Sequence, residues 1–291
     1  MSGVPGEPAT LIVSDLHLGQ PGRSPDAGAF APLFAGFERV VVNGDAAEVQ
    51  VPELRVAAAR QLERLRGVAE AAGAELVLIA GNHDAFLTDR RRLSLLGGRV
   101  LVTHGDVLHP AIAPWSSGAA EMRRDTAARL AAWREATVRS RDAEPDADTL
   151  LEIARHVSHG EFLRLRRGEV ASPLRRVLWW SVHPRRFLSV LHYWRTVPAR
   201  AAAFAELAQP EAEVVVIGHS HRAGVWRVGG RTVLNTGSYP WPGKPHAVVV
   251  RSGGLAFHRV VEGAGGFELD PEVLYMHAGA GSKRGREIER E

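Results

Sequence analysis

The sequence contains no cysteine among its 291 residues. Disulfides, thiolate metal sites and cysteine nucleophiles are therefore excluded, and any metal must be held by His, Asp, Glu or Asn. Such donors suit harder ions such as Mn, Fe or Zn. The chain also lacks an uninterrupted apolar run that could span a bilayer, and its first residues have neither the basic nor the apolar region of a signal peptide. We therefore expect a cytoplasmic protein.

The charge and composition indicate a globular protein without pointing to a partner. The formal net charge is only +3, with 45% hydrophobic and 24% charged residues. These fractions are ordinary for a globular domain, and so small a net charge gives no reason to expect nucleic acid binding. A chain of this length can form one large α/β domain or two small ones.

Several short apolar runs end in loops that carry His, Asp or Asn beside glycine. Leu76–Ala80, for example, is followed by Gly81-Asn82-His83-Asp84. A continuous apolar run of this length is typical of an inner parallel strand, and in open α/β sheets the chemistry collects where such strands end. The runs 10–13, 39–42, 76–80, 99–103 and 213–217 are followed by Asp15, His17, Asp45, Asn82, His83, Asp84, His104, His219 and His221.

Each of these loops is a weak signal by itself. Asp15 and His17 alone fit a surface loop as well as a metal site. Taken together the loops are a strong signal, because five of the thirteen histidines lie in them. Chance placement is a poor explanation for that.

The order Asp-x-His, Gly-Asp, Gly-Asn-His-Asp, His-Gly-Asp, Gly-His-x-His resembles the calcineurin-like metallophosphoesterase superfamily over residues 10–106 and 213–260. The resemblance implies an α/β fold, a four-layer sandwich of two mixed β-sheets flanked by helices, with a binuclear metal centre at the strand ends. It implies these metal ligands: Asp15, His17 and His221 on one ion, Asn82, His104 and His219 on the other, and Asp45 bridging both. A late Asn235-Thr236-Gly237-Ser238 turn also matches the superfamily.

The chemistry of such a centre is phosphoester hydrolysis. Two divalent ions about 3.5–4 Å apart can bind a bridging hydroxide and clamp a phosphoryl group for in-line attack. We expect Mn, with Fe or Zn as alternatives. Asp45 can bridge because a carboxylate has two oxygens, and His83 is then free to protonate the leaving oxygen. Asp84 is either the orienting partner of His83 or a structural loop residue. Glu48 stands where many superfamily members have Asp, and we expect it to support the site without binding metal.

Residues 107–212 form an insertion longer than a fold connection requires. Its pattern predicts helices over 118–140, 148–167, 173–182 and 185–206. It holds five of the seven tryptophans, and residues 170–205 contain no Asp or Glu but several arginines. We predict the following division: 1–9 a flexible N-terminus, 10–106 and 213–262 the catalytic domain, 107–212 a helical lid, and 278–291 a disordered tail.

A lid at this place resembles the UDP-2,3-diacylglucosamine hydrolases, which cleave the pyrophosphate of a nucleotide-linked, doubly acylated sugar at the membrane surface. Arginines suit phosphates, and aromatic residues suit acyl chains or the inner face of the membrane. We expect these substrate-binding residues: Arg175, Arg176, Arg185, Arg186 and Trp194. Simple packing of the lid explains its aliphatic residues equally well. The alternatives are a metallophosphoesterase acting on a soluble phosphodiester or phosphoprotein, and a non-catalytic membrane or nucleic-acid binding protein, although no nucleic-acid recognition motif is present.

Overall fold

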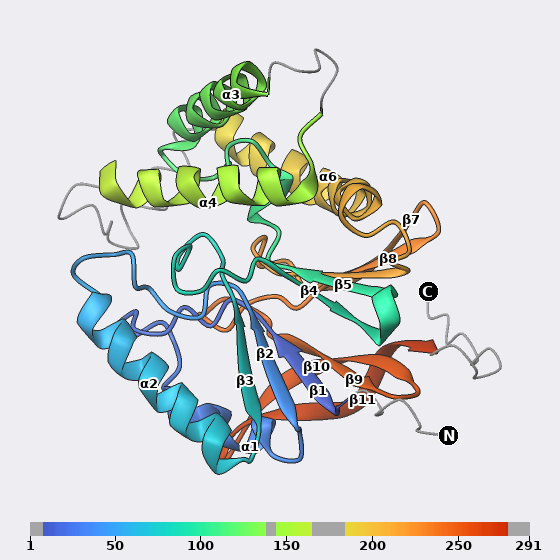
Figure 1. Cartoon of the computed structure of the whole chain (residues 1–291). Helices are drawn as coiled ribbons and strands as arrows, with labels where there is room; N and C mark the ends of the chain where they lie inside the picture. The colour runs from blue at the N-terminus through green and yellow to red at the C-terminus, as the bar shows by residue number, and fades with distance from the viewer. Residues whose placement is uncertain (1–7, 138–143, 165–183, 279–291) are drawn as a thin grey trace.

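The computed structural model describes residues 8–137, 144–164 and 184–278. Two mixed β-sheets lie face to face in it (Figure 1). The first has six strands in the order β11-β10-β9-β1-β2-β3. Its strands are β1 (Thr10–Val13), β2 (Arg39–Asn43), β3 (Glu75–Ile79), β9 (His246–Arg251), β10 (Gly254–Gly263) and β11 (Gly266–Ala278). Strands β1, β2 and β3 are parallel, so their carboxyl ends meet at one edge.

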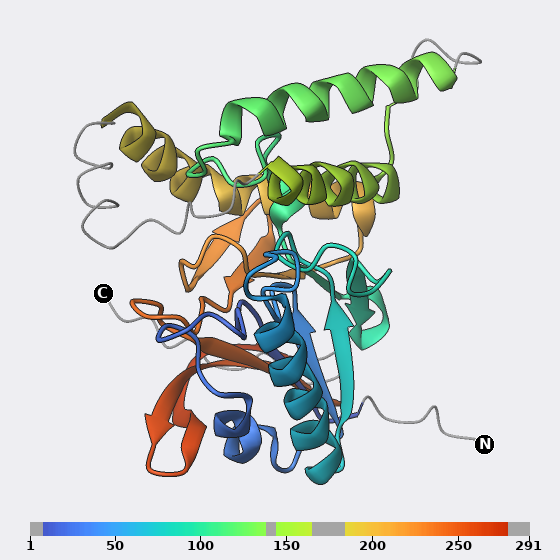
Figure 2. The same ribbon diagram turned by 90° about the vertical axis from the view of Figure 1, so that its left-hand side faces the viewer.

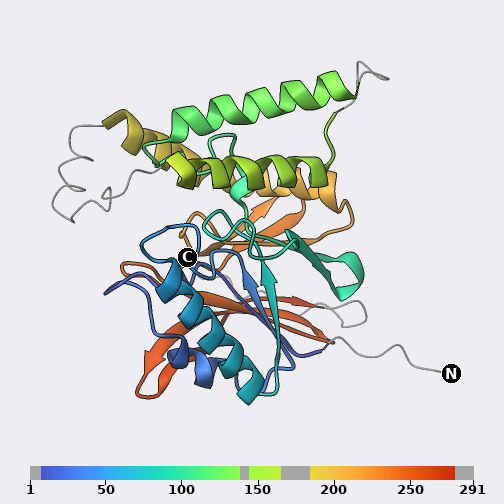
Figure 3. The ribbon, with the colours of Figure 1, turned by 60° about the vertical axis from the view of Figure 1, so that its left-hand side comes forward.

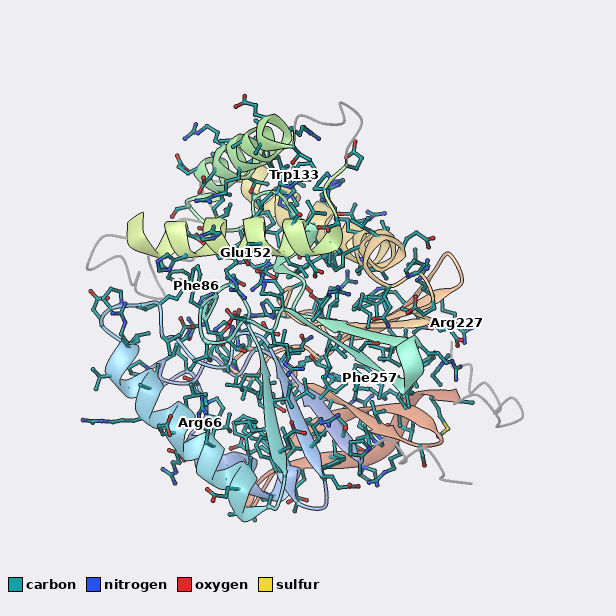
Figure 4. The ribbon with its side chains drawn as sticks, viewed as in Figure 1. Arg66, Phe86, Trp133, Glu152, Arg227 and Phe257 are labelled. Carbon is teal, nitrogen blue, oxygen red and sulfur yellow. The ribbon has the colours of Figure 1, made fainter. Side chains whose placement is uncertain are left out.

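The second sheet has five strands in the order β4-β5-β6-β8-β7. Its strands are β4 (Arg92–Leu95), β5 (Val100–Thr103), β6 (Val214–Ile217), β7 (Gly224–Val228) and β8 (Arg231–Asn235). The three central strands β5, β6 and β8 are parallel, and the outer two run antiparallel to them. Apolar side chains of both sheets, Val41, Val102 and Phe257 among them, form one buried core. Phe257 is labelled in Figure 4.

Helices cover the outer face of each sheet. On the first sheet lie η1 (Ala27–Phe30), α1 (Ala31–Phe34) and α2 (Arg55–Ala71). Leu62 and Leu65 of α2 join Leu11 and Val40 in the core on that side. On the second sheet lies α6 (Pro184–Ala208), whose Tyr193, Val197 and Phe204 pack against Val215 and Val233. The predicted α/β sandwich of two mixed sheets flanked by helices is therefore confirmed.

The remaining helices stand beyond the strand ends. They are α4 (Ala147–Arg164) and α3 (Ala119–Ala136), with the short turns η2 (Leu96–Gly98) and η3 (Asp106–Leu108) nearer the sheets. Strands β2 and β3 point toward α4, and α3 lies outside it (Figure 2, Figure 3). None of the helices in the described part of the chain combines the length and apolar character that crossing a bilayer requires.

Two strands lie where no strand was expected. The strand β4 is a four-residue edge strand, too short for an alternation pattern to register. The strand β11 is mostly polar and contains Pro271, which an edge strand tolerates because one side of its backbone needs no partner. The helix predicted over 173–182 and the tail from 279 lie outside the described residues. The division into catalytic domain and lid stays a prediction.

Candidate metal centre

The predicted ligands come together at the carboxyl ends of the parallel strands. Donor atoms of Asp15, His17, Asp45 and His221 lie within 4.8 Å of one another, and so do those of Asp45, His104 and His219. Asp45 belongs to both groups. Because β1, β2 and β3 are parallel in one sheet, and β5 and β6 in the other, all five loops emerge on the same side. Apart from His221 and His83, these side chains are almost fully buried.

Backbone strain marks the same residues. Among the described residues, seven that are not glycine have a left-handed φ. Five of them are predicted ligands: Asp15, His17, Asp45, His219 and His221. Residues other than glycine adopt this conformation rarely, although Asp and His do so more often than most, and such residues cluster at functional sites. The unusual backbone conformation of these loops therefore sets the directions of the five side chains.

The His104 ring lies among three hydrogen-bond acceptors, one at Nδ1 and two at Nε2. Its Nδ1 donates to the Asn43 carbonyl oxygen at 2.9 Å, and its Nε2 lies 3.3 Å from Asn82 Oδ1 and 3.3 Å from Asp45 Oδ2. A proton on Nε2 or a cation must therefore lie between these three atoms. Burial alone lowers the pKa of His104, but the carboxylates of Asp45 and Asp15 outweigh it and raise it to about 10. The site demands positive charge here.

His219 is held in the form that a metal ligand needs. Its Nε2 donates to the Ile112 carbonyl oxygen at 3.0 Å, which leaves Nδ1 with a free lone pair. Burial, and then the neighbouring His104, lower the pKa of His219 to about 4, so the ring is neutral. Ile112 itself has a left-handed φ of 50°, a rare conformation for a β-branched residue. That strain turns its carbonyl toward the histidine.

The second donor group has the same arrangement. His17 Nδ1 donates to Glu48 Oε1 at 2.7 Å, so its Nε2 keeps a lone pair. That Nε2 lies 3.1 Å from His221 Nε2, and Asp15 Oδ1 lies 3.1 Å from the same His221 atom. A carboxylate behind a metal-binding imidazole is the usual outer support of such sites. The donor sets therefore fit two divalent cations that share Asp45.

His83 pairs with Glu48 and not with Asp84, which leaves Asp84 the structural role of the two that we expected for it. His83 Nδ1 lies 2.7 Å from Glu48 Oε2, and the ring is 28% exposed, so it can reach a bound substrate. Burial lowers the pKa of His83, but Glu48 and Asp45 outweigh it and raise it to about 10. Burial would raise the pKa of Glu48, yet His83 and His17 hold it well below its usual range. The ionised carboxylate keeps His83 protonated.

Asp84 supports the backbone instead of orienting His83. Its carboxylate accepts from the backbone N–H of Gly81 at 2.6 Å, Ala46 at 2.7 Å and Asp45 at 3.3 Å. Behind this turn, Arg91 donates to the Ala80 carbonyl oxygen and pairs with the buried Asp106 at 2.6 Å. These charged side chains join the loops that carry Asp45, Asn82 and His104.

The predicted substrate-binding residues are placed only in part. Arg175 and Arg176 lie outside the described residues, as do the side chains of Arg185 and Arg186. Trp194 is partly buried, and its Nε1 donates to the Ser220 carbonyl oxygen at 3.2 Å. Since Ser220 lies between His219 and His221, the described contact of Trp194 supports a ligand loop. Its binding of substrate stays a prediction.

Sequence reasoning missed several residues around the centre: Asn43, Gln50, Ile112, His159 and Phe162. Asn43 and Ile112 act through backbone carbonyl oxygens, which no residue type reveals. His159 and Phe162 lie on α4, where the Phe162 ring stands 5.1 Å from that of His83. Only the position of Gln50 could have drawn attention to it, because it follows Glu48 by two residues and so lies next to a predicted site loop.

Gly81 is required at its position by a close approach. A Cβ added there would lie 2.2 Å from Asp45 Oδ1 and 2.5 Å from the Asp45 backbone nitrogen. Neither atom can move without shifting the shared carboxylate.

We expect Gly81→Ala to weaken Mn²⁺ binding by at least about tenfold, within the range for disturbed metal-site supports. Calorimetric titration with Mn²⁺ measures this. The matched control is Gly67→Ala on α2, which has open space around it and should bind as wild type. Unchanged affinity in Gly81→Ala would contradict the geometry.

Comparison with known proteins bears on one part of the chain. Residues 168–252 match the model of the calcineurin-like phosphoesterase superfamily domain. This stretch contains His219, His221 and the Asn235–Ser238 turn, and the other predicted ligands precede it. No curated protein matches the sequence.

Solved structures with similar folds show low similarity throughout. A dimetal phosphatase from Danio rerio has 10% identity and a TM-score of 0.42, covering 86% of this chain and 95% of its own. The phosphoesterase Yfce from E. coli has 16% identity and a TM-score of 0.41, covering 93% and 99%. Vacuolar Protein Sorting 29 from Cryptosporidium parvum has 11% identity and a TM-score of 0.39, covering 94% and 98%. The fold assignment rests on the strand order described above.

Proposed function

We propose that the protein is a binuclear metal-dependent phosphoester hydrolase of the calcineurin-like superfamily. The observation that carries this is the convergence of imidazole nitrogens and carboxylate oxygens around one shared carboxylate. His104 and His219, each held by a carbonyl oxygen from behind, and His17, held by Glu48, turn their remaining nitrogens toward the shared Asp45. The buried carboxylates of Asp15 and Asp45 need positive charge among these nitrogens, and divalent cations would supply it.

The residues that would hold the ions are those named above. Asp15, His17 and His221 would hold one, and Asn82, His104 and His219 the other, with Asp45 on both. Bound divalent ions supply an acidified water as the nucleophile and positive charge that offsets the phosphoryl oxygens. The donors are nitrogen and oxygen only, which suits Mn, our first candidate, and also Fe and Zn.

His83 would complete the reaction from the protein side. Hydrolysis breaks the bond from phosphorus to the leaving oxygen, and that oxygen needs a proton as it departs. His83 lies beside the donor atoms, is kept protonated by Glu48, and is open to solvent on one side. Its backbone N–H donates to Asp45 Oδ1 at 2.8 Å, which fixes its distance from the shared ligand. These features support the assignment of His83 as the general acid.

For the substrate, we propose a nucleotide- or lipid-linked pyrophosphate such as UDP-2,3-diacylglucosamine. The support is the sequence of the insertion, which is rich in arginine and tryptophan and contains no acidic residue from 170 to 205. Arginine forks suit a pyrophosphate, and the apolar residues suit acyl chains. With such a substrate the enzyme would be cytoplasmic and would contact the inner face of the membrane peripherally. A soluble phosphodiester or phosphoprotein is the competing substrate class.

A substrate panel with Mn²⁺ tests both the proposed hydrolase activity and the proposed lipid-linked substrate. It compares UDP-2,3-diacylglucosamine, the same nucleotide sugar without acyl chains, and a chromogenic diester. Contact with only four methylenes would contribute about 3 kcal/mol, so we expect kcat/KM to be roughly 100-fold higher for the acylated substrate. Equal values for the acylated and deacylated compounds would remove the lipid substrate. No hydrolysis of any member with Mn, Fe or Zn would remove the hydrolase itself.

A further inference from the structure

We infer that Gln50 is a positioning residue for the metal ligand Asn82, and that His159 of α4 holds Gln50 in place. The helical insertion would then take part in metal binding as well as in covering the substrate. The inference rests on the proposed metal centre. The observation behind it is a continuous chain of hydrogen bonds from α4 to the Asn82 backbone. His159 Nδ1 lies 2.7 Å from Gln50 Oε1, and Gln50 Nε2 lies 2.7 Å from the Asn82 carbonyl oxygen.

The chemistry of the three groups allows only one arrangement of these bonds. A backbone carbonyl only accepts, so the Gln50 amide must turn its NH2 toward Asn82. Its Oε1, which also only accepts, then faces His159, whose Nδ1 must carry a proton. Each bond thus fixes the orientation required by the other. A glutamine with only one of its two ends bound would keep the freedom to rotate away.

The turn that carries Asn82 depends on such side-chain support. Gly81 has no Cβ, and its neighbours crowd it too closely to admit one. The amide of Gly81 is held by Asp84, and the carbonyl oxygens of Ala80 and Gly81 are held by Arg91. Gln50 holds the next carbonyl oxygen, that of Asn82 itself. Of these supports, Gln50 alone has a described contact that leads into the insertion.

Helix α4 is firmly attached at this point. Arg155, one turn before His159, is buried and donates to the Asp89 carboxylate at 3.1 Å and to the Asp89 carbonyl oxygen at 3.0 Å. Its guanidinium lies 5.4 Å from the centre of the Phe86 ring, and the His159 ring meets Phe86 edge-on at 5.0 Å. Figure 4 shows Phe86 directly beneath α4. The helix therefore presents His159 from a fixed place, as a positioning group needs.

Asn82 is the ligand that would need this help most. Its amide oxygen is neutral, so charge attraction holds it to a cation less strongly than it holds a carboxylate. Its contribution depends on the direction in which the backbone aims it. Because the Asn82 carbonyl is bonded to its Cα, loss of the bond from Gln50 would free the backbone of the turn that aims the Asn82 side chain at His104. We therefore expect the loss in metal affinity to appear at the ion bound by Asn82, His104 and His219.

The test measures Mn²⁺ binding by calorimetry to the full chain. Wild type is expected to bind two ions. Gln50→Met, which keeps the length of the side chain but forms neither bond, and His159→Ala should each weaken one of the two sites by about tenfold, as loss of outer supports does. His159→Asn places an amide NH2 where Nδ1 stands and should restore binding to within about twofold. The control is His156→Ala on the same helix, where the side chain also meets Phe86 but pairs with Glu152.

The outcomes separate this inference from the proposed function. If wild type binds neither Mn²⁺ nor, in the same titration, Fe²⁺ or Zn²⁺, the metal centre fails and the inference fails with it. If wild type binds two ions and both Gln50→Met and His159→Ala bind them as tightly, only the inference is overturned. It is also overturned if His159→Asn binds as poorly as His159→Ala. Without metal, the Gln50 and His159 variants should unfold at the same temperature as the His156→Ala control. A lower unfolding temperature in the Gln50 and His159 variants alone would show a merely structural effect and reject positioning.

Discussion

Replacing Asp45 by asparagine is expected to lower the hydrolysis of a phosphodiester by roughly a thousandfold or more. Asp45 Oδ2 lies 3.3 Å from His104 Nε2 and 3.7 Å from His17 Nε2, between the two donor groups. An asparagine of the same shape has only one oxygen. If that oxygen keeps the bond from the His83 backbone N–H, the NH2 must face the two histidine nitrogens and occupy the place of a cation. A loss of several kcal/mol of charge stabilisation corresponds to the expected factor.

The fold should survive this change, because the substitution alters no packing. Two measurements separate loss of metal from loss of structure. The first is the unfolding temperature of the metal-free protein, which should remain within a few degrees of wild type. The second is the rise of that temperature on adding Mn²⁺, which wild type should show and Asp45→Asn should lack. A ligand at a hundred times its Kd stabilises a protein by about 2.7 kcal/mol, so the rise is measurable.

Asp148→Asn is the matched control. Asp148 pairs with Arg92 on the surface at 2.9 Å and 3.0 Å, away from the donor groups. Exposed pairs of this kind contribute about 0–1 kcal/mol, so activity and the response to Mn²⁺ should both be retained. Full activity in Asp45→Asn would reject the metal centre as described.

The positions of the ligand loops could be predicted from the sequence because they depend on local rules. A short apolar run followed by glycine ends a buried strand, and parallel strands bring such ends to one edge. Asp15, Asp45 and His104 follow strands of this kind, so their meeting needed no knowledge of side-chain packing. The order of motifs then carried the resemblance to a known superfamily.

The partners of those residues could not be predicted, because they depend on how loops cross. Glu48 reaches His83 from a different strand end, and nothing in the spelling Gly-Asn-His-Asp favours Glu48 over the adjacent Asp84. The left-handed backbone of Asp15 or His219 could not be predicted either, because most Asp and His residues have a negative φ. Such strain exists only when the surrounding structure imposes it.

The insertion shows the same limit on a larger scale. Helical periodicity predicts its helices but not the surfaces they cover. Helix α6 covers the second sheet through Val197 and Phe204, as an outer layer of the sandwich. Helix α4 instead faces the strand ends, where His159 and Phe162 meet Gln50 and His83. The predicted lid therefore combines two structural roles. Helix α6 completes the outer layer of the fold, and helix α4 lies beside the candidate site.

Replacing Glu48 by glutamine is expected to lower kcat by roughly a hundredfold at neutral pH, within the range for loss of a general acid. Glu48 is buried and bonds two imidazoles at once, His17 through Oε1 and His83 through Oε2, both at 2.7 Å. A glutamine has one acceptor oxygen, so one histidine must face an NH2 group. The change also removes the negative charge that raises the pKa of His83.

The direction of the pH dependence follows from that charge. With Glu48 present, His83 remains protonated well above neutral pH. In Glu48→Gln its pKa falls, so the proton needed by the leaving oxygen is lost at a lower pH. The basic limb of the rate profile should therefore move to lower pH, and the deficit relative to wild type should be larger at pH 8 than at pH 6. Saturating Mn²⁺ is required, because weaker support of His17 also reduces metal affinity by about 10–100-fold.

The leaving group distinguishes this acid catalysis from a general disturbance of the site. A p-nitrophenolate ion departs readily without a proton, whereas an alkoxide needs one. Both Glu48→Gln and His83→Ala should therefore lose much more activity on an alkyl diester than on a p-nitrophenyl diester. The control is Glu75→Gln, whose carboxylate lies on the surface in a pair with Arg39. If the two diesters lose activity equally in both variants, His83 does not act as the acid, and its pairing with Glu48 serves only to hold His17 at the metal.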